Sequence, residues 1–268
     1  NYLQENGLKA TLVAIANSLL DRALGIRIYR SIRIHNRKAT NIFKGRHLTE
    51  SSQGYYYVDP MPSNEELSVY YENAYWVSRS GKQYGATGRD FIHYSILKEY
   101  IGHSLSSDRV FLNFGAGYGW VSNILWTNGL HIVNVEPSGL PKAYSERWDT
   151  YKSIEEVPSG SVDIVYGSHS LEHVSDIDQF QKHVKRVIKR NGFVFWEVPN
   201  AENPLDGPMN NRIDIPHTYY FKKQYFENIF SKMYINDCFD QSHEFGVFDN
   251  WREFQNDIGC VIRVLGKF

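Results

Sequence analysis

Three alternating glycines followed by an acidic residue form the pattern in this sequence with the clearest chemical meaning. Gly115, Gly117 and Gly119 directly follow a short apolar run. Glu136 lies about twenty residues beyond them. Glycine lets the backbone turn sharply and lets a ligand approach main-chain N–H groups without a Cβ in the way. An acid at the end of the next strand can accept hydrogen bonds from both hydroxyls of a ribose.

The spacing of the glycines distinguishes between two classes of nucleotide ligand. Trp120 occupies the position where a dinucleotide-binding G-x-G-x-x-G motif has its third glycine. The spacing therefore favours an adenosyl ligand without a pyrophosphate. A dinucleotide in an NAD-type oxidoreductase is one alternative, and a glycine turn that binds no ligand is another.

The elements that must hold these residues are a strand, a helix and a second strand. Short apolar runs predict strands over 110–114 and 131–135, and a helix is expected to begin near Val121. Beyond them the pattern predicts strands over 149–151, 162–166, 193–198, 233–239 and 260–265, and helices over 138–147, 177–190 and 222–232. We expect Asn191 and Gly192 to close the helix 177–190.

This alternation predicts an α/β fold with a doubly wound, mostly parallel, seven-stranded sheet and an antiparallel C-terminal hairpin. We expect a core over 106–268, preceded by an N-terminal helical extension and lid over 1–105. Within the extension, helical spacing of apolar residues over 8–28 predicts a helix that packs on the domain or forms a homodimer. Ser63 and Glu66 form a capping box that predicts a further helix start.

The overall composition limits the classes of partner. With 268 residues, a net charge of −1 and a pI of about 6.9, nothing indicates a nucleic-acid partner. Cys238 and Cys260 fit no metal-binding pattern and are expected to be buried in a reducing, cytoplasmic compartment. No apolar run is long enough for stable membrane insertion.

Two blocks of sequence together resemble the class I S-adenosylmethionine-dependent methyltransferases. One is the glycine block at 109–137, and the other, at 161–200, contains a Leu-Glu-His signature, an Arg-Val-Ile-Lys helix end and a Val-Pro-Asn strand end. The segment 55–75 is similar to one that precedes the core in a bacterial subgroup acting on sugars and secondary metabolites. The resemblance implies a Rossmann-like fold with S-adenosyl-L-methionine as cofactor and S-adenosyl-L-homocysteine as product.

Ligands of open α/β sheets bind beyond the carboxyl ends of the parallel strands, and this rule selects the site residues. By the resemblance, Glu136 binds the ribose, the glycine loop faces the methionine part, and residues after the third strand touch the adenine. The predicted cofactor-binding residues are Asn113, Gly115, Ala116, Gly117, Tyr118, Gly119, Glu136, Pro137, Tyr151, Ser153, Ser168, His169 and Leu171. Asn113 stands where the family usually has an acid that braces the glycine loop, so this position departs from the pattern.

Histidines are the candidate catalytic residues. Methyl transfer needs an aligned nucleophile, and a hydroxyl nucleophile also benefits from a base. His169 follows the fourth strand, and His217 resembles a histidine that faces the substrate in this family; both are predicted to be catalytic. Glu172 and His173 are expected to have structural roles at a helix start. No Asp-rich partner pattern accompanies the histidines, and no metal site is predicted.

The sequence therefore predicts a cytoplasmic S-adenosylmethionine-dependent methyltransferase with a small-molecule or glycan substrate. The predicted reaction is O-methylation of a sugar in bacterial polysaccharide biosynthesis, on a surface polysaccharide or its nucleotide-linked precursor. The polar loop 201–216 offers Asn and Asp side chains for binding hydroxyls. The alternatives are an NAD-type oxidoreductase and a non-catalytic scaffold with a methyltransferase fold.

Overall fold

The computed structural model describes residues 42–71, 86, 88–102, 105–138, 146–202, 213, 216–230, 232–238 and 261–268. The chain divides into two compact units. One comprises Asn1–Lys44 and Asn64–Lys82, and the other Gly45–Ser63 and Gln83–Phe268. The boundary at residue 105 stays a prediction. The expected helix 8–28, most of the polar loop 201–216 and most of the helix 138–147 lie outside the described residues.

The smaller unit contains α2 (Asn64–Tyr70), which begins directly after Ser63, where the capping box predicts a helix start. Among the described helices of the chain, none combines the length and the apolar character that crossing a membrane requires.

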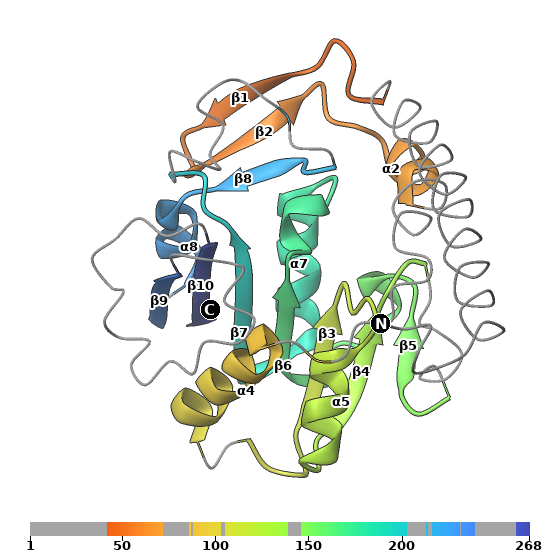
Figure 1. Ribbon diagram of the computed structural model, residues 1–268, viewed down its shortest axis with the longest axis vertical. Helices are drawn as coiled ribbons and strands as arrows, with labels where there is room; N and C mark the ends of the chain where they lie inside the picture. Colours follow the sequence, from red (N-terminus) through yellow and green to blue (C-terminus); the bar gives the residue numbers. More distant parts are fainter. Residues whose placement is uncertain are drawn as a thin grey trace, which may run out of the picture. The chain divides into compact units, whose positions relative to one another are not determined.

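The larger unit is built on a seven-stranded sheet with the strand order β5-β4-β3-β6-β7-β10-β9 (Figure 1). The strands are β3 (Val110–Phe114), β4 (His131–Val135), β5 (Asp149–Tyr151), β6 (Val162–Ser168), β7 (Ile188–Pro199), β9 (Lys232–Cys238) and β10 (Val261–Lys267). The first five strands in this order run parallel, and β10 pairs antiparallel with both β7 and β9. The expected mostly parallel sheet with an antiparallel C-terminal hairpin is confirmed.

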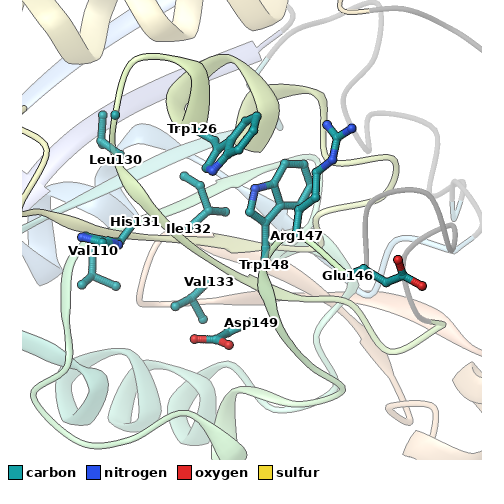
Figure 2. A pocket seen from close by; sticks show the side chains of 11 residues that line it. Val110, Trp126, Leu130, His131, Ile132, Val133, Glu146, Arg147, Trp148 and Asp149 are labelled. Carbon is teal, nitrogen blue, oxygen red and sulfur yellow. The ribbon is translucent and has the colours of Figure 1, made fainter.

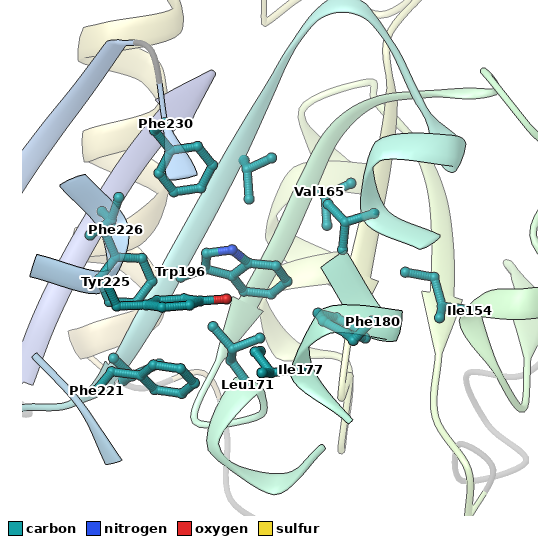
Figure 3. Packing of buried hydrophobic residues seen from close by; sticks show 14 of the residues in the cluster. Ile154, Val165, Leu171, Ile177, Phe180, Trp196, Phe221, Tyr225, Phe226 and Phe230 are labelled. Carbon is teal, nitrogen blue, oxygen red and sulfur yellow. The ribbon is translucent and has the colours of Figure 1, made fainter. Parts of the chain in front are cut away.

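Helices cover both faces of this sheet, and each face has its own hydrophobic core. The helices are α4 (Gly88–Ile101), α5 (Trp120–Thr127), α7 (Ile177–Val187) and α8 (Lys223–Ile229). Successive strand residues point to opposite faces. Trp196 packs with Phe180 of α7 and Phe226 of α8 on one face (Figure 3). Its neighbour Phe195 belongs to the other core, together with Leu97 of α4. The sheet is therefore doubly wound.

A second sheet of three strands is a feature that the sequence patterns did not predict. It contains β1 (His47–Ser51), β2 (Tyr55–Asp59) and β8 (Tyr219–Phe221), paired antiparallel in that order. A bridge between Asn200 and Phe221 connects the end of β7 to β8. The segment near residue 55 is thereby held close to the segment that follows the polar loop.

The helix expected over 177–190 ends three residues early, and this corrects the prediction. α7 ends at Val187, and Ile188 already begins β7. Asn191, with a φ of 67°, lies within the strand and does not close the helix. The pairing of β7 with β6 is irregular between Val162 and Ile164, which accommodates this local conformation. Sheet pairing therefore overrides the helical periodicity of the last residues. Similarly, α8 ends at Ile229, short of the expected residue 232.

Asp163 braces the amino ends of the central strands. Its carboxylate accepts hydrogen bonds from Arg109 Nη1 at 2.7 Å, from the Val110 N–H at 2.9 Å and from Lys189 Nζ at 2.6 Å. Burial tends to raise the pKa of this carboxyl, but the bonds from Lys189, Val110 and Arg109 outweigh it and hold the pKa below its ordinary value.

Replacing Asp163 with Asn should lower the free energy of unfolding by about 2 kcal/mol at pH 7, because two cations lose their anionic partner. A pKa depressed by folding gives stability that is present above the ordinary pKa and is lost as the pH falls. The difference between wild type and variant should therefore shrink below about pH 4. Urea unfolding across pH measures it. Asp178→Asn, at an exposed position on α7, should change the free energy of unfolding little. An equal loss in both variants would show that the contacts of Asp163 do not stabilise the sheet.

Candidate active site

The glycine turn after β3 has the open backbone that a ligand needs. Gly115, Gly117 and Gly119 have φ values of 68°, 57° and 70°, in the left-handed region that favours glycine. A Cβ on Gly115 would lie 2.5 Å from the Cβ of Ser170, whereas a Cβ on Gly117 would meet no heavy atom within 4 Å. The turn is therefore packed on one side and open at Gly117.

Glu136 lies beside this turn, as the sequence pattern predicts. The side chain is 7% exposed, and its Oε2 accepts a hydrogen bond of 2.9 Å from the Gly117 N–H. Its Oε1 accepts a bond of 2.6 Å from the Ser138 hydroxyl. Each carboxylate oxygen has a second lone pair, so the group keeps capacity to accept further hydrogen bonds.

The residues after β4 and β5 gather next to Glu136. The N–H of Glu136 donates to the carbonyl of Tyr151 at 3.0 Å, and Pro137 is exposed. Ser153 accepts a bond from the Glu155 N–H at 3.2 Å and caps a short 3₁₀ helix, η3 (Ile154–Glu156). The residues that are predicted to touch the adenine are therefore adjacent to Glu136, the residue that is predicted to bind the ribose.

Asn113 is buried below the glycine turn and bonds to the helix behind it. Its Nδ2 donates to Ser122 Oγ at 2.9 Å, and that hydroxyl donates to Asn134 Oδ1 at 2.7 Å. These bonds join β3, α5 and β4 in the interior. The uncharged amide at this position thus holds α5 in place behind the turn.

The loop after β6 carries His169 between two carboxylates. His169 Nδ1 lies 3.3 Å from Glu172 Oε1, and Nε2 lies 3.4 Å from Glu197 Oε1. Burial tends to lower the pKa of His169, but the bonds and charges of Glu172 and Glu197 outweigh it and raise the pKa to about 9. The backbone φ of 49° is unusual for a residue other than glycine. Strained backbone of this kind often occurs at functional sites.

The other predicted residues of this loop differ in their exposure. Ser168, the last residue of β6, is half-buried, and its hydroxyl donates to Glu197 Oε1 at 3.0 Å. The Leu171 side chain is 0% exposed and packs in the core, so only its backbone is available to a ligand.

Glu197 is the main polar residue of this region that the sequence reasoning missed. It is 1% exposed and accepts hydrogen bonds from His93 Nε2 at 2.7 Å and from Arg263 Nε. Arg89 Nε lies 3.7 Å from its Oε1. Burial tends to raise the pKa of Glu197, but the charges of His93 and Arg263 hold it well below the ordinary value. The feature of the sequence that could have indicated Glu197 is that it is the one acidic residue within the apolar run 193–198.

The structure brings Glu172 and His173 together with the distant His217. Leu171–His173 forms a short 3₁₀ helix, η4, and the N-terminus of α7 is capped by Asp176. His173 Nε2 lies 3.8 Å from Glu172 Oε1. The rings of His173 and His217 meet edge to face with their centroids 4.9 Å apart. Both predicted catalytic histidines, His169 and His217, are thus near Glu172.

A separate pocket of about 730 Å³ lies at the other end of the strands. It is lined by Val110 and His131, the first residues of β3 and β4, and by Trp126 and Trp148 (Figure 2). Ligands of this fold class bind at the carboxyl ends of the strands. The pocket is therefore not the predicted cofactor site.

The packing of the glycine turn can be tested with a matched pair of variants. Gly115→Ala should lower the free energy of unfolding by about 2–4 kcal/mol, because the new Cβ clashes with Ser170 and the backbone is strained. Gly117→Ala has the same strain without the clash and should cost about 1–2 kcal/mol. Urea unfolding measures both. Equal losses would show that Gly115 does not pack against Ser170.

Comparison with known proteins shows the family to which the chain belongs. Residues 55–241 match a family model described as a methyltransferase domain. A S-adenosylmethionine-dependent methyltransferase from Archaeoglobus fulgidus is 16% identical, with 67% of this chain and 94% of that chain covered and a TM-score of 0.48. One from Mesorhizobium loti is 10% identical, with 66% and 97% covered and a TM-score of 0.47. No curated protein is similar enough to be matched. The chain therefore belongs to the methyltransferase-domain family, whose cofactor is S-adenosylmethionine.

Proposed function

We propose that the protein transfers the methyl group of S-adenosylmethionine to a hydroxyl of a sugar, on a bacterial surface polysaccharide or its nucleotide-linked precursor. The observation that carries the proposal is the pairing of Glu136 with the open glycine turn at Gly117. The choice of a sugar is supported by the Asn and Asp side chains of the polar segment 201–216. It also draws on the resemblance of the segment 55–75 to one that precedes the core in bacterial methyltransferases acting on sugars and secondary metabolites.

The residues around the turn fit an adenosyl cofactor. Glu136 keeps acceptor capacity for ribose hydroxyls, and the open space at Gly117 lets a ligand approach the backbone. Tyr151 and Ser153 follow β5, next to Glu136, and are the proposed neighbours of the adenine. Ala116, Tyr118 and Pro137 complete the proposed lining of the cofactor site. In this assignment Asn113 supports the turn from behind through Ser122.

Bound S-adenosylmethionine supplies an electrophilic methyl group on a sulfonium. The task of the chain is to hold the acceptor oxygen in line with that methyl group and to accept the hydroxyl proton. His217 is the proposed proton acceptor, and His169 is a second catalytic histidine that accepts a proton only in its neutral form, because its pKa is raised to about 9. Both lie beside Glu172 near the loop that touches the glycine turn.

Calorimetry tests the proposed cofactor site. Glu136→Ala should weaken binding of S-adenosylmethionine by about 100-fold or more, because hydrogen bonds to a charged acceptor are lost. Glu136→Gln keeps the side-chain shape and checks that the loss is not a folding defect. Glu156→Gln, at an exposed position after β5, is the control. Binding of NADH without any response to S-adenosylhomocysteine would instead support an oxidoreductase.

Single-turnover methylation of sugar acceptors tests the histidines. His169→Gln and His217→Gln should each lower the rate of methyl transfer by about 10²–10⁴-fold, the range expected for loss of a general base. Affinity for S-adenosylmethionine should change little. His131→Gln, at an exposed position on β4, is the matched control. Unchanged rates in both active-site variants would remove the histidines from the mechanism.

A further inference from the structure

A carboxylate and two imidazoles converge at the start of β8. Glu172, His173 and His217 each offer one ligand atom, and these atoms all lie within 4.8 Å of one another. Glu172 and His173 belong to η4, whereas His217 is 44 positions beyond His173 in the chain. All three belong to the larger compact unit.

The Glu172 carboxylate gives an independent reason to expect a cation there. It is 1% exposed, and within the described part of the chain its oxygens have ion-pair contacts with imidazoles but no well-aligned hydrogen-bond donor. The nearest charged or polar nitrogens, of His169 and His173, are 3.3 Å and 3.8 Å away. Burial of this carboxylate carries a large desolvation cost, which the ion pair with His169 offsets in part and a directly bound cation would offset further.

Thr218 holds the two parts of this cluster in place. Its N–H donates to the Glu172 carbonyl at 2.8 Å, and its hydroxyl lies 2.9 Å from that carbonyl and 2.6 Å from the Val174 carbonyl. The side chain is 0% exposed. Because His217 directly precedes Thr218, these contacts fix its backbone beside η4. The cluster is therefore pre-organised, as a metal site must be.

We propose that Glu172, His173 and His217 bind a divalent transition-metal ion such as Zn²⁺ or Mn²⁺. Imidazole donors suit Zn²⁺ and the carboxylate suits Mn²⁺, whereas Mg²⁺ and Ca²⁺ favour sites built from oxygen ligands alone. Three protein ligands leave coordination positions open, which is the pattern of catalytic rather than structural sites. The sequence patterns predicted no metal site, because no Asp-rich partner pattern accompanies the histidines, and His217 comes from a distant segment.

The position of the cluster suggests its role, and this part rests on the proposed methyl transfer. Ser170, at the start of the same turn, lies against Gly115 of the glycine turn. A metal held by these residues would lower the pKa of a coordinated sugar hydroxyl, so that its proton could leave to solvent. The oxygen–methyl bond then forms as the carbon–sulfur bond breaks, and S-adenosylhomocysteine leaves with the bonding electron pair on sulfur. In this form of the reaction His217 is a metal ligand and not the proton acceptor.

Metal binding by the full chain tests the proposal without any need for activity. After treatment with a chelator, the protein should take up one equivalent of Zn²⁺ or Mn²⁺, measured by calorimetry and elemental analysis. Glu172→Gln and His217→Gln should each weaken binding by about 100-fold or more, beyond the 10–100-fold typical of outer-shell changes. His131→Gln, at an exposed position outside the cluster, should bind like wild type.

A spectroscopic measurement guards against misfolded variants. Co²⁺ added to the wild-type protein should give visible absorption bands that are lost in His217→Gln, whose half-buried side chain makes it the milder change. Circular dichroism confirms that each variant is folded. Failure of wild-type protein to bind Zn²⁺ or Mn²⁺ at millimolar concentration would overturn the proposal. Binding that survives both cluster substitutions would overturn it too, because the ion would then lie elsewhere.

The metal site and the methyl transfer can fail separately. Zn²⁺ or Mn²⁺ binding that depends on Glu172 and His217, without binding of S-adenosylmethionine, would leave the metal site standing and reject the proposed reaction. Methyl transfer by wild-type protein that binds neither Zn²⁺ nor Mn²⁺ at millimolar concentration would reject the metal site alone. Methyl transfer that persists in chelator, by protein that does bind these ions, would reject only the role of the metal in the reaction.

Discussion

The buried carboxylate of Glu197 is the interaction on which the arrangement of the site depends. It joins α4, β6 and β10 through His93, Ser168 and Arg263. A buried charge is tolerated only when it is well paired, so removal of one partner would leave the others without compensation. The Glu197 carbonyl also accepts the His169 N–H at 2.9 Å, which fixes the start of the loop after β6. His169 therefore depends on this charge cluster for its position.

The loop after β6 lies between the glycine turn and the cluster of Glu172, His173 and His217. On one side Ser170 packs against Gly115, and on the other η4 presents Glu172 and His173 toward His217. Methyl transfer is mainly a problem of alignment, because the reacting bonds are on the substrate and cofactor. A rigid loop between the glycine turn and the histidine cluster suits that requirement. The second sheet adds to the rigidity, because Thr218, at the start of β8, bonds to η4.

Local periodicity predicted the bounds of elements correctly where interactions within the segment determine its secondary structure. The strands Val110–Phe114, His131–Val135 and Asp149–Tyr151 have the expected bounds. The patterns failed where pairing with a strand distant in the chain determines the secondary structure. The last turn of the expected helix 177–190 became strand because β6 pairs with it, and the three-residue strand β8 exists only because β2 lies beside it.

For the site, residue types and spacing predicted the glycine turn and Glu136, because these features lie close together in the chain, and the resemblance to a known family supplied the cofactor. Tertiary structure decided which polar groups meet. His93 and Arg263 reach Glu197 across separations of 104 and 66 residues, and His217 meets Glu172 from beyond the polar loop. Such meetings follow from the order of strands in the sheet and the packing of helices on it. The spacing of residues along the chain does not indicate the strand order or the helix packing.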